Sequence, residues 1–232
     1  MTRSKSISVG LVVVNFNVGG LENVVYSLYT DLKALGFKVT IFSENGLDGY
    51  YAGLVNSDDF VFLDNKLEFL FAEIASRKIN VLNFHHSTFG IQECSSIGLP
   101  CVYTVHNCYS WLDTESFAEW SSLVEQATCI VSVSQFVKWY YESRTVSQHN
   151  NSVVIMNGVD INRIASSKCS IDADFDWCGD HYIFAQFASF YPIKHQFLVI
   201  RAAEKLHDLG LDFRLLFFGN VGDNNYFDFI ND

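Results

Sequence analysis

Charged residues are scarce in this chain, and basic residues are scarcer than acidic ones. Only 18% of the 232 residues are charged, and 15 Lys and Arg stand against 26 Asp and Glu, which gives a net charge of −11. No run of four basic residues occurs. Because proteins bind phosphate backbones through clustered Lys and Arg, the composition argues against a surface for nucleic acid.

Long apolar runs are missing as well. No stretch approaches the roughly 18 apolar residues that a membrane-spanning helix needs. The N-terminus places Arg3 and Lys5 before a short apolar run, as a signal peptide does, but that run ends at Asn15 without a small-residue cleavage site. We interpret the run as a first strand, and we expect a cytoplasmic protein that meets a membrane, if at all, as a peripheral protein at its inner face.

Cysteine pairs of the C-x-x-C type do not occur, so the sequence indicates neither a zinc ribbon nor a redox dithiol. We expect free buried thiols in a reducing compartment, with Cys101 in a strand and with Cys94 and Cys108 in flanking loops. The six cysteines are Cys94, Cys101, Cys108, Cys129, Cys169 and Cys178.

Apolar residues are plentiful: 49% of the chain is hydrophobic, with 21 Phe and 11 Tyr. This composition is globular and permits a sizeable core. Most apolar runs are continuous rather than alternating, which is typical of strands covered by helices on both faces. The strands predicted in the first part of the chain are 7–15, 37–43, 60–64, 79–84, 101–105, 128–133 and 152–156.

Amphipathic segments fill the gaps between these runs and predict helices. Gly36 stands where a left-handed residue would end the first helix. Asp113 or Thr114 is suited to begin the third helix, and Ser134 the fourth. The predicted helices are 21–35, 66–78, 114–126 and 134–143.

The alternation of strands and helices predicts an α/β fold with a doubly wound parallel sheet. We assign residues 1–164 to one complete Rossmann-like domain, the polar segment 165–181 to a linker, and 182–232 to the first part of a second such domain. Two strands and one helix cannot close a core of their own, so the second domain is predicted to be incomplete. Its elements are the strands 182–189 and 213–219 and the helix 195–209.

Gly19 and Gly20 separate the first predicted strand from its helix, and Glu22 lies in the first helical turn. The free N–H groups at the positive end of a helix bind phosphate or another anion. A plain tight turn is the alternative reading. A dinucleotide site is the third: the G-x-G-x-x-G pattern is absent, but Glu44 follows the second strand at about the place of a ribose-binding acid.

Three histidines follow predicted strands. His106 comes after 101–105, and His85 and His86 come after 79–84. In parallel sheets, ligands bind outside the carboxyl ends of the strands, where His106 could act as a base, donate to a sugar hydroxyl, or merely satisfy loop carbonyls. The other two could line the same cleft or cap their strand. No carboxylate partner or H-x-x-x-H spacing supports a metal site.

Lys194 follows the strand 182–189 at the start of the next helix. A cation at a helix start is unfavourable for the helix dipole unless an anion binds there too. The position therefore indicates a phosphate site on the second domain, and a solvated surface lysine is the alternative.

The motifs taken together resemble the GT-B glycosyltransferases of the large retaining group often called family 4. That group has a GG-x-E turn, a T-x-H loop, a "vSvS" strand, an NGVD crossing and a P-x-K phosphate loop. The resemblance runs over nearly the whole chain and implies two Rossmann-like domains, the first for the acceptor and the second for the nucleotide-sugar donor. The segments that carry it are GGLEN (19–23), VYTVHN (102–107), CIVSVS (129–134), NGVD (157–160) and FASFYPIK (187–194).

The resemblance assigns roles to individual residues. It implies that the backbone at Gly19 and Gly20 approaches the donor phosphate or the acceptor. It implies that His106 touches the transferred sugar and that Lys194 neutralises the diphosphate leaving group, where preorganised charge is a large catalytic term. We therefore predict His106 and Lys194 as catalytic, and Gly19, Gly20 and Lys194 as donor-binding.

For the acceptor side, we predict contacts from Glu22, His85, His86 and Asn107. The same resemblance implies that the reaction needs no metal and no cofactor besides the nucleoside-diphosphate sugar. The reaction predicted is transfer of a hexose to a saccharide or lipid-linked acceptor in polysaccharide- or lipopolysaccharide-type glycan synthesis, with the anomeric configuration retained.

Two departures from the family pattern matter. Ser189 stands where the family usually has a second phosphate-binding arginine, and the chain reaches Asp232 before the family's E-x7-E segment. We therefore expect a truncated second domain and an impaired activity of this chain alone.

Two other readings stay open. The chain could be a non-catalytic half of a split enzyme, which associates with a partner subunit or with itself through the incomplete second sheet. It could also be an NAD(P)-binding oxidoreductase that uses Gly20 and Glu44.

Overall fold

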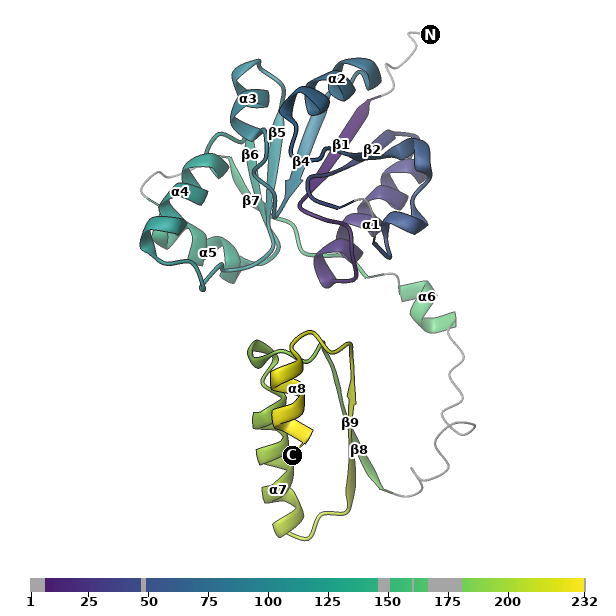
Figure 1. The fold of residues 1–232 in the computed structure, drawn as a ribbon, viewed down its shortest axis with the longest axis vertical. Coiled ribbons are helices and arrows are strands. Elements are labelled where there is room, and N and C mark those ends of the chain that lie inside the picture. Colours follow the sequence, from purple (N-terminus) through teal and green to yellow (C-terminus); the bar gives the residue numbers. More distant parts are fainter. Residues whose placement is uncertain (1–6, 47–48, 146–150, 160, 167–180, 232) are drawn as a thin grey trace. The chain divides into compact units, whose positions relative to one another are not determined.

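The computed structural model describes residues 7–46, 49–145, 151–159, 161–166 and 181–231. The chain divides into two compact units, Met1–Val159 and Asp160–Asp232, and each is described by itself (Figure 1). Most of the linker predicted over 165–181, together with Cys169 and Cys178, lies outside the described residues.

The first unit alternates strands and helices along its length, and every strand and helix predicted for it is present, with ends that shift by one or two residues. Its strands are β1 (Ser8–Val13), β2 (Lys38–Ser43), β3 (Phe60–Phe62), β4 (Val81–His85), β5 (Cys101–Val105), β6 (Cys129–Ser132) and β7 (Ser152–Val154). Its helices are α1 (Gly20–Ala34), α2 (Leu67–Arg77), α3 (Ile91–Ser96), α4 (Thr114–Val124) and α5 (Gln135–Arg144), with the short 3-10 helices η1 (Ala52–Leu54) and η2 (Ser57–Asp59).

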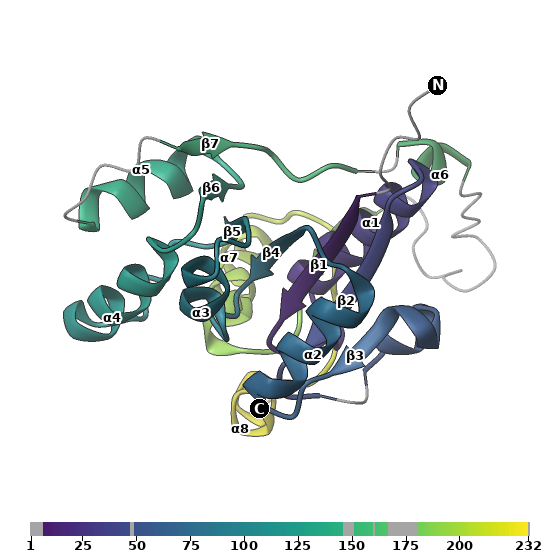
Figure 2. The ribbon, with the colours of Figure 1, turned by 90° about the horizontal axis from the view of Figure 1, so that it is seen from above.

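The seven strands form one parallel sheet in the order β3-β2-β1-β4-β5-β6-β7, which can be followed by the labels in Figure 2. The predicted doubly wound parallel sheet is therefore confirmed. From β1 the chain first builds outward to β3 and then returns to the other side of β1 with β4. Sheets of this kind bind ligands outside the carboxyl ends of the two strands where the order reverses, here β1 and β4.

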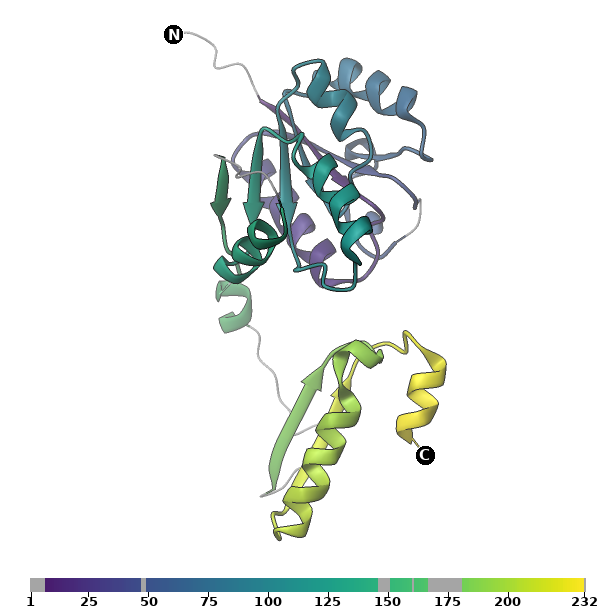
Figure 3. The ribbon, with the colours of Figure 1, turned by 90° about the vertical axis from the view of Figure 1, so that its left-hand side faces the viewer.

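Helices cover both faces of the sheet, as the continuous apolar runs predict (Figure 3). On one face, Val25 and Tyr29 of α1 pack with Leu11 of β1 and Ile41 of β2. Neighbouring strand residues point the other way because side chains alternate along a strand. Val12 accordingly belongs to the cluster on the opposite face.

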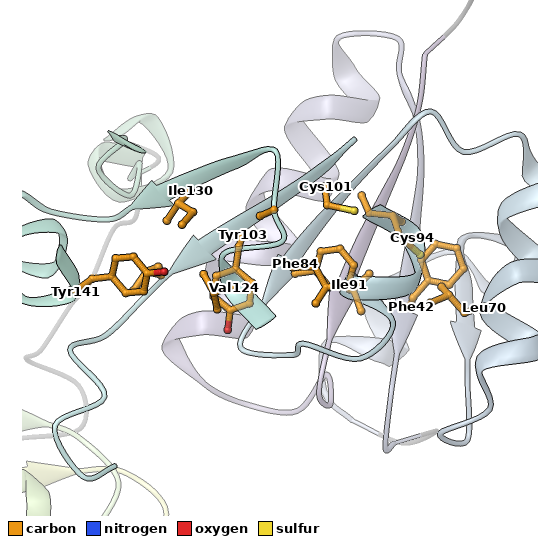
Figure 4. Close-up of a cluster of buried hydrophobic side chains, with 14 of the residues drawn as sticks. Phe42, Leu70, Phe84, Ile91, Cys94, Cys101, Tyr103, Val124, Ile130 and Tyr141 are labelled. Atoms are coloured by element: carbon orange, nitrogen blue, oxygen red, sulfur yellow. The ribbon is translucent and has the colours of Figure 1, made fainter. Parts of the chain in front are cut away.

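The opposite face carries the larger cluster, to which α2, α3, α4 and α5 all contribute (Figure 4). Tyr103 of β5 is its largest fully buried side chain, and its hydroxyl accepts a hydrogen bond of 3.0 Å from Trp120 Nε1. Burying one large apolar side chain contributes about 2 kcal/mol to stability. The labelled members in Figure 4 are Phe42, Leu70, Phe84, Ile91, Cys94, Cys101, Tyr103, Val124, Ile130 and Tyr141.

The predicted helix ends are confirmed by their hydrogen bonds. Gly36 has the left-handed φ of +90° directly after α1. Asp113 Oδ1 accepts from the N–H of Ser116 at 2.8 Å, and Ser134 Oγ accepts from the N–H of Val137 at 3.1 Å. A side-chain cap of this kind contributes about 1 kcal/mol.

Helix α3 was not predicted, and it corrects the expectation for one cysteine. Cys94 lies in α3 and not in a loop. Its thiol is free and buried, as is that of Cys101, and burial raises the pKa of Cys94 to about 12 and that of Cys101 to about 11. Both thiols are therefore protonated and inert at neutral pH. Cys108 and Cys129 are free as well.

The second unit is small. β8 and β9 pair in parallel, and α7 lies along this two-stranded sheet (Figure 1). Much of β8 is exposed, with Tyr182 at 65% and Phe187 at 76%. The short helices α6 and α8 were not predicted. The elements are α6 (Ile161–Ser166), β8 (Tyr182–Phe187), the 3-10 helix η5 (Pro192–Lys194), α7 (Gln196–Asp208), β9 (Phe213–Phe218) and α8 (Asn224–Asn231).

Candidate functional site

The predicted site residues of the first unit gather at the carboxyl edge of three neighbouring strands. Gly19 and Gly20 follow β1, while His86 comes after β4 and His106 after β5, and these strands are adjacent in the order β1-β4-β5. The edge therefore includes the place where the strand order reverses, which is the expected ligand site of a doubly wound sheet.

The glycine turn leads directly into α1. Gly19 is the residue before the first helical turn, with an extended φ of −174°, and Glu22 is the third residue of the helix. A Cβ atom at Gly19 would collide with the Glu22 carboxylate, so this carboxylate folds back over the turn. At Gly20, by contrast, an added Cβ would meet no described atom within 4 Å. The Glu22 carboxylate thus covers the backbone at Gly19, whereas the backbone at Gly20 is left uncovered.

Glu22 brings a negative group to the positive end of the α1 dipole, which is stabilising. Burial raises the pKa of Glu22. An anionic ligand at this helix start would be repelled by the Glu22 carboxylate. A ligand hydroxyl, by contrast, could donate a hydrogen bond to this carboxylate. This geometry favours the predicted acceptor role of Glu22.

His85 and His106 are in direct contact. Nδ1 of His85 lies 2.9 Å from Nε2 of His106, and their ring centroids are 5.1 Å apart. His85 is 1% exposed, whereas His106 is partly exposed. Burial, and next the neighbouring His106, hold the pKa of His85 well below its ordinary value of 6.5. Burial, and next the neighbouring His86, lower the pKa of His106 to about 4. Both rings are therefore neutral at pH 7.

His86 lies near His106 but outside the hydrogen-bonded pair. Its backbone has the left-handed φ of +66°, its side chain is exposed, and its ring packs against Tyr109 with centroids 5.3 Å apart. A non-glycine residue with this backbone conformation is uncommon, although histidine adopts it more often than most residues do. His86 is thus placed to meet a ligand at the same edge as His106.

Asn107 and Glu44 complete the edge. The Asn107 side chain is exposed, and its Oδ1 accepts from the N–H of Cys108 at 2.7 Å, which leaves the amide nitrogen free to donate. Glu44 follows β2, and its Oε2 accepts from the hydroxyl of Ser87 at 2.8 Å. The Glu44 carboxylate is therefore engaged in joining two loops, which weighs against the ribose contact that a dinucleotide site would require.

Lys194 lies in the second unit, in the loop between β8 and α7. It is the last residue of η5, and its side chain is exposed. Two glutamine amides hold this loop: Gln186 Nε2 donates to the carbonyl of Lys194 at 2.8 Å, and Gln196 Nε2 donates to the carbonyl of Ser189 at 2.9 Å. Gln196 is fully buried. The lysine thus projects from a loop whose backbone is fixed at both ends.

The sequence did not point to Ser87, Gln186 or Gln196. Each holds a loop through a hydrogen bond, and a lone serine or glutamine in a strand, in a loop or at a helix start carries no sequence signal of that kind. The His85–His106 contact could have been expected, because the two residues end adjacent strands and His85 pairs in register with Thr104.

The described residues offer neither a metal cluster nor a membrane-spanning helix. No group of three or more His, Cys, Asp or Glu side chains in that part of the chain is arranged to hold a metal ion. Within the same residues, none of the helices has the length and apolar character needed to cross a membrane.

Comparison with known proteins gives a family and a fold. The sequence profile of Glycosyltransferase Family 4 matches residues 18–163. No curated protein matches the chain significantly.

Solved structures match at low sequence identity. A glycosyltransferase from Rickettsia africae ESF-5 is 16% identical, with a TM-score of 0.77 over 98% of this chain and 64% of its own. Anabaena HepE, in complex with UDP and glucose, is 15% identical, with a TM-score of 0.68 over 95% of this chain and 71% of its own. An alpha-glucosyltransferase in complex with UDP and a 13-mer DNA is 12% identical, with a TM-score of 0.62 over 97% of this chain and 58% of its own. The chain thus shares the GT-B fold and spans about three fifths to seven tenths of these structures.

Proposed function

Since this chain belongs to Glycosyltransferase Family 4, we propose that it transfers a hexose from a nucleoside-diphosphate sugar to a saccharide or lipid-linked acceptor. The product is a glycan of the polysaccharide or lipopolysaccharide type, formed with retention of the anomeric configuration. One observation supports the proposal: the matched residues 18–163 contain the glycine turn and three histidines at the carboxyl edge of the first sheet, two of which are in contact.

The first unit supplies the groups for the acceptor and the sugar. His86 and Asn107 are exposed at this edge and can bond acceptor hydroxyls, and the half-buried Glu22 carboxylate offers them an oxygen. His106 meets the transferred hexose. The open backbone at Gly20 allows a phosphate or sugar group to approach the start of α1 without a steric clash.

The second unit supplies the charge for the leaving group. When the bond between the anomeric carbon and the diphosphate oxygen breaks, the nucleoside diphosphate departs with the electron pair and gains negative charge. Lys194 stands on a loop whose backbone Gln186 holds, and its exposed ammonium group can reach that charge. Ser189 stands where the family usually places a second phosphate-binding arginine, so we assign the neutralisation of the diphosphate to Lys194. The carbonyl of Ser189 accepts a hydrogen bond from Gln196, which holds the start of the loop.

Nucleic acid is not the acceptor in this proposal, although several similar alpha-glucosyltransferase structures hold DNA. The net charge of −11 opposes the approach of a phosphate backbone. We place the protein in the cytoplasm, peripheral at the inner face of the membrane where a lipid-linked acceptor is used. We further propose that the transfer runs without a metal ion, so that a chelator leaves the rate unchanged.

Calorimetry with UDP, GDP, their sugar conjugates and NAD tests the proposal directly. We expect one nucleoside diphosphate to bind, and we expect Lys194→Ala to weaken it roughly tenfold or more. Lys205→Ala is the control, because Lys205 is also an exposed lysine of the second unit but lies in the last turn of α7, away from the loop that carries Lys194. Sugar-transfer assays with the bound donor then follow.

Three results contradict the proposal in different ways. Binding of NAD that is lost in Glu44→Ala would show a dinucleotide site. Binding of the nucleotide that is equal in Lys194→Ala and Lys205→Ala would remove Lys194 from the donor site. Absence of binding by every nucleotide would leave the second candidate function, considered next.

The second candidate is a non-catalytic binding subunit, and the exposure of β8 favours it. The outward side chains of this strand are apolar, and an open strand can pair with another chain. Such a subunit would bind acceptor or a partner, through this sheet or as a second copy, without turnover of the donor. Sedimentation of the chain over a range of concentrations measures whether it associates with itself.

A further inference from the structure

We infer that His85 is a positioning residue, which holds His106 in the tautomer that carries its proton on Nδ1. His106 then offers an N–H group to the ligand, and not the lone pair that a general base requires. The identity of that ligand group, an oxygen of the hexose, rests on the proposed function, whereas the tautomer itself rests on the free protein.

The geometry gives His85 no other task. Its ring is 1% exposed, so a ligand cannot touch it, and its Nδ1 lies 2.9 Å from His106 Nε2. The predicted acceptor contact of His85 can therefore act only through His106. In the described part of the chain, this is the one side-chain hydrogen bond that His106 makes.

A neutral imidazole has one donor nitrogen and one acceptor nitrogen, so the pair can share its proton in two ways. In the first, His85 Nδ1–H donates to a bare Nε2 of His106. In the second, His106 Nε2–H donates to a bare Nδ1 of His85. The choice fixes the outer nitrogens as well: the first arrangement leaves Nδ1–H on His106, and the second leaves Nε2–H on His85.

The buried Nε2 of His85 decides between them. It is shielded from solvent and has no hydrogen-bond partner among the described residues. In the second arrangement this atom would be an N–H donor without an acceptor, and buried N–H groups of that kind are rarer in proteins than under-satisfied acceptors. In the first arrangement the Nε2 of His85 carries no proton and is only an acceptor without a donor, which costs less. The first arrangement is therefore the stable one.

Both rings are neutral in this arrangement, because burial and the neighbouring histidines oppose a positive charge on either. The partly exposed edge of His106 then presents Nδ1–H toward the ligand side of the sheet. A neutral N–H donor fits a sugar hydroxyl or ring oxygen, and it does so over a wide range of pH. Of the two chemical roles that the sequence left open for His106, donor and base, the pairing with His85 selects the donor.

Nitrogen-15 NMR of the uniformly labelled chain tests the tautomer without any substrate, because a protonated ring nitrogen and a bare one differ widely in chemical shift. We expect His106 to show a protonated Nδ1 and a bare Nε2, and His85 to show the same. The signals are assigned by their loss in His106→Asn and His85→Asn. A protonated Nε2 on His106 in the wild-type chain would overturn the inference.

Two variants of His85 test the positioning role. In His85→Asp a carboxylate that only accepts stands where Nδ1 stood, so we expect His106 to carry a proton on Nε2. In His85→Asn the amide nitrogen stands where Nδ1 stood and can still donate, so we expect the Nδ1–H tautomer of His106 with a bare Nε2 to be kept. If Nε2 of His106 stays bare in His85→Asp, the inference fails even where transfer is slowed. If neither variant folds, the wild-type spectrum alone decides the tautomer.

Sugar transfer gives an independent readout. If the chain transfers a hexose, we expect kcat to fall more in His85→Asp than in His85→Asn. If the chain transfers nothing but shows the expected tautomers, the proposed function fails while the inference about the pair stands.

Discussion

The Ser87 hydroxyl donates a 2.8 Å hydrogen bond to the Glu44 carboxylate, and so joins the loop after β4 to the loop after β2. These two strands lie on either side of β1, so the bond passes the end of the strand that leads into the glycine turn. Ser87 also accepts from the N–H of Phe89 at 3.1 Å. The contact therefore holds the shape of the edge where the candidate site lies.

We expect Glu44→Ala and Ser87→Ala each to lower the free energy of unfolding by about 1 kcal/mol, because each leaves a partner of this bond unpaired. The double variant should lose little more than either single variant, since both remove the same interaction. Denaturant unfolding of the three variants measures this. Fully additive losses would mean that the two side chains act separately.

Gly20→Ala separates a ligand site from a plain turn. The added Cβ meets no described atom within 4 Å, and alanine suits a helix better than glycine. We expect the free energy of unfolding to stay the same or to rise by up to about 1 kcal/mol. We expect nucleotide binding to weaken nonetheless, because the methyl group occupies the open side of the turn. Unchanged calorimetric binding would identify the glycine as a turn residue only.

Acid should destabilise the first unit through the histidine pair. The folded pKa of His106 is lowered from 6.5 to about 4, so as the pH falls the unfolded chain takes up the proton first. Stability is therefore lost between about pH 6.5 and pH 4, by roughly 3 kcal/mol for a shift of this size. We expect His106→Asn to show a smaller loss over this range of pH. His207→Gln is the control, because His207 is exposed on α7. Equal pH dependence of wild type and His106→Asn would contradict the buried neutral pair.

Gln186→Ala should weaken nucleotide binding without any change of charge. The Gln186 amide holds the carbonyl of Lys194, so its removal frees the loop that carries the ammonium group. We expect the dissociation constant for the bound nucleoside diphosphate to rise several-fold, and less than in Lys194→Ala. An unchanged dissociation constant would show that the loop is fixed by other contacts.

Most of the fold follows from the sequence because the signals are local and repeated. The continuous apolar runs predict buried parallel strands, and Gly36, Asp113 and Ser134 mark helix ends by their own backbone chemistry. Helix α3 could not be predicted from such local signals. It has six residues, and it begins after Gly90, whose left-handed φ of +78° follows from tertiary packing. Short helices are stabilised by their surroundings, which a local pattern does not contain.

The candidate site could be predicted in its parts but not in its contacts. His85 at the end of β4 and His106 just after β5 lie at one edge, yet the burial of each ring depends on the residues that pack over that edge. Glu44 has the spacing of a ribose-binding acid, but its carboxylate accepts a hydrogen bond from the Ser87 hydroxyl. Spacing along the chain sets the edge on which a residue lies, whereas the direction of its side chain is set by neighbours distant in sequence.

The left-handed backbone at His86 makes two adjacent identical residues chemically different. The His85 ring is buried and hydrogen-bonded to the His106 ring, while the His86 side chain is exposed. An acylating reagent selective for imidazole should therefore modify His86 readily and leave His85 untouched as long as the chain stays folded. His85 therefore serves as an internal reference for His86. The difference in acylation between these two neighbours, measured in one peptide, reports whether this edge of the sheet is folded.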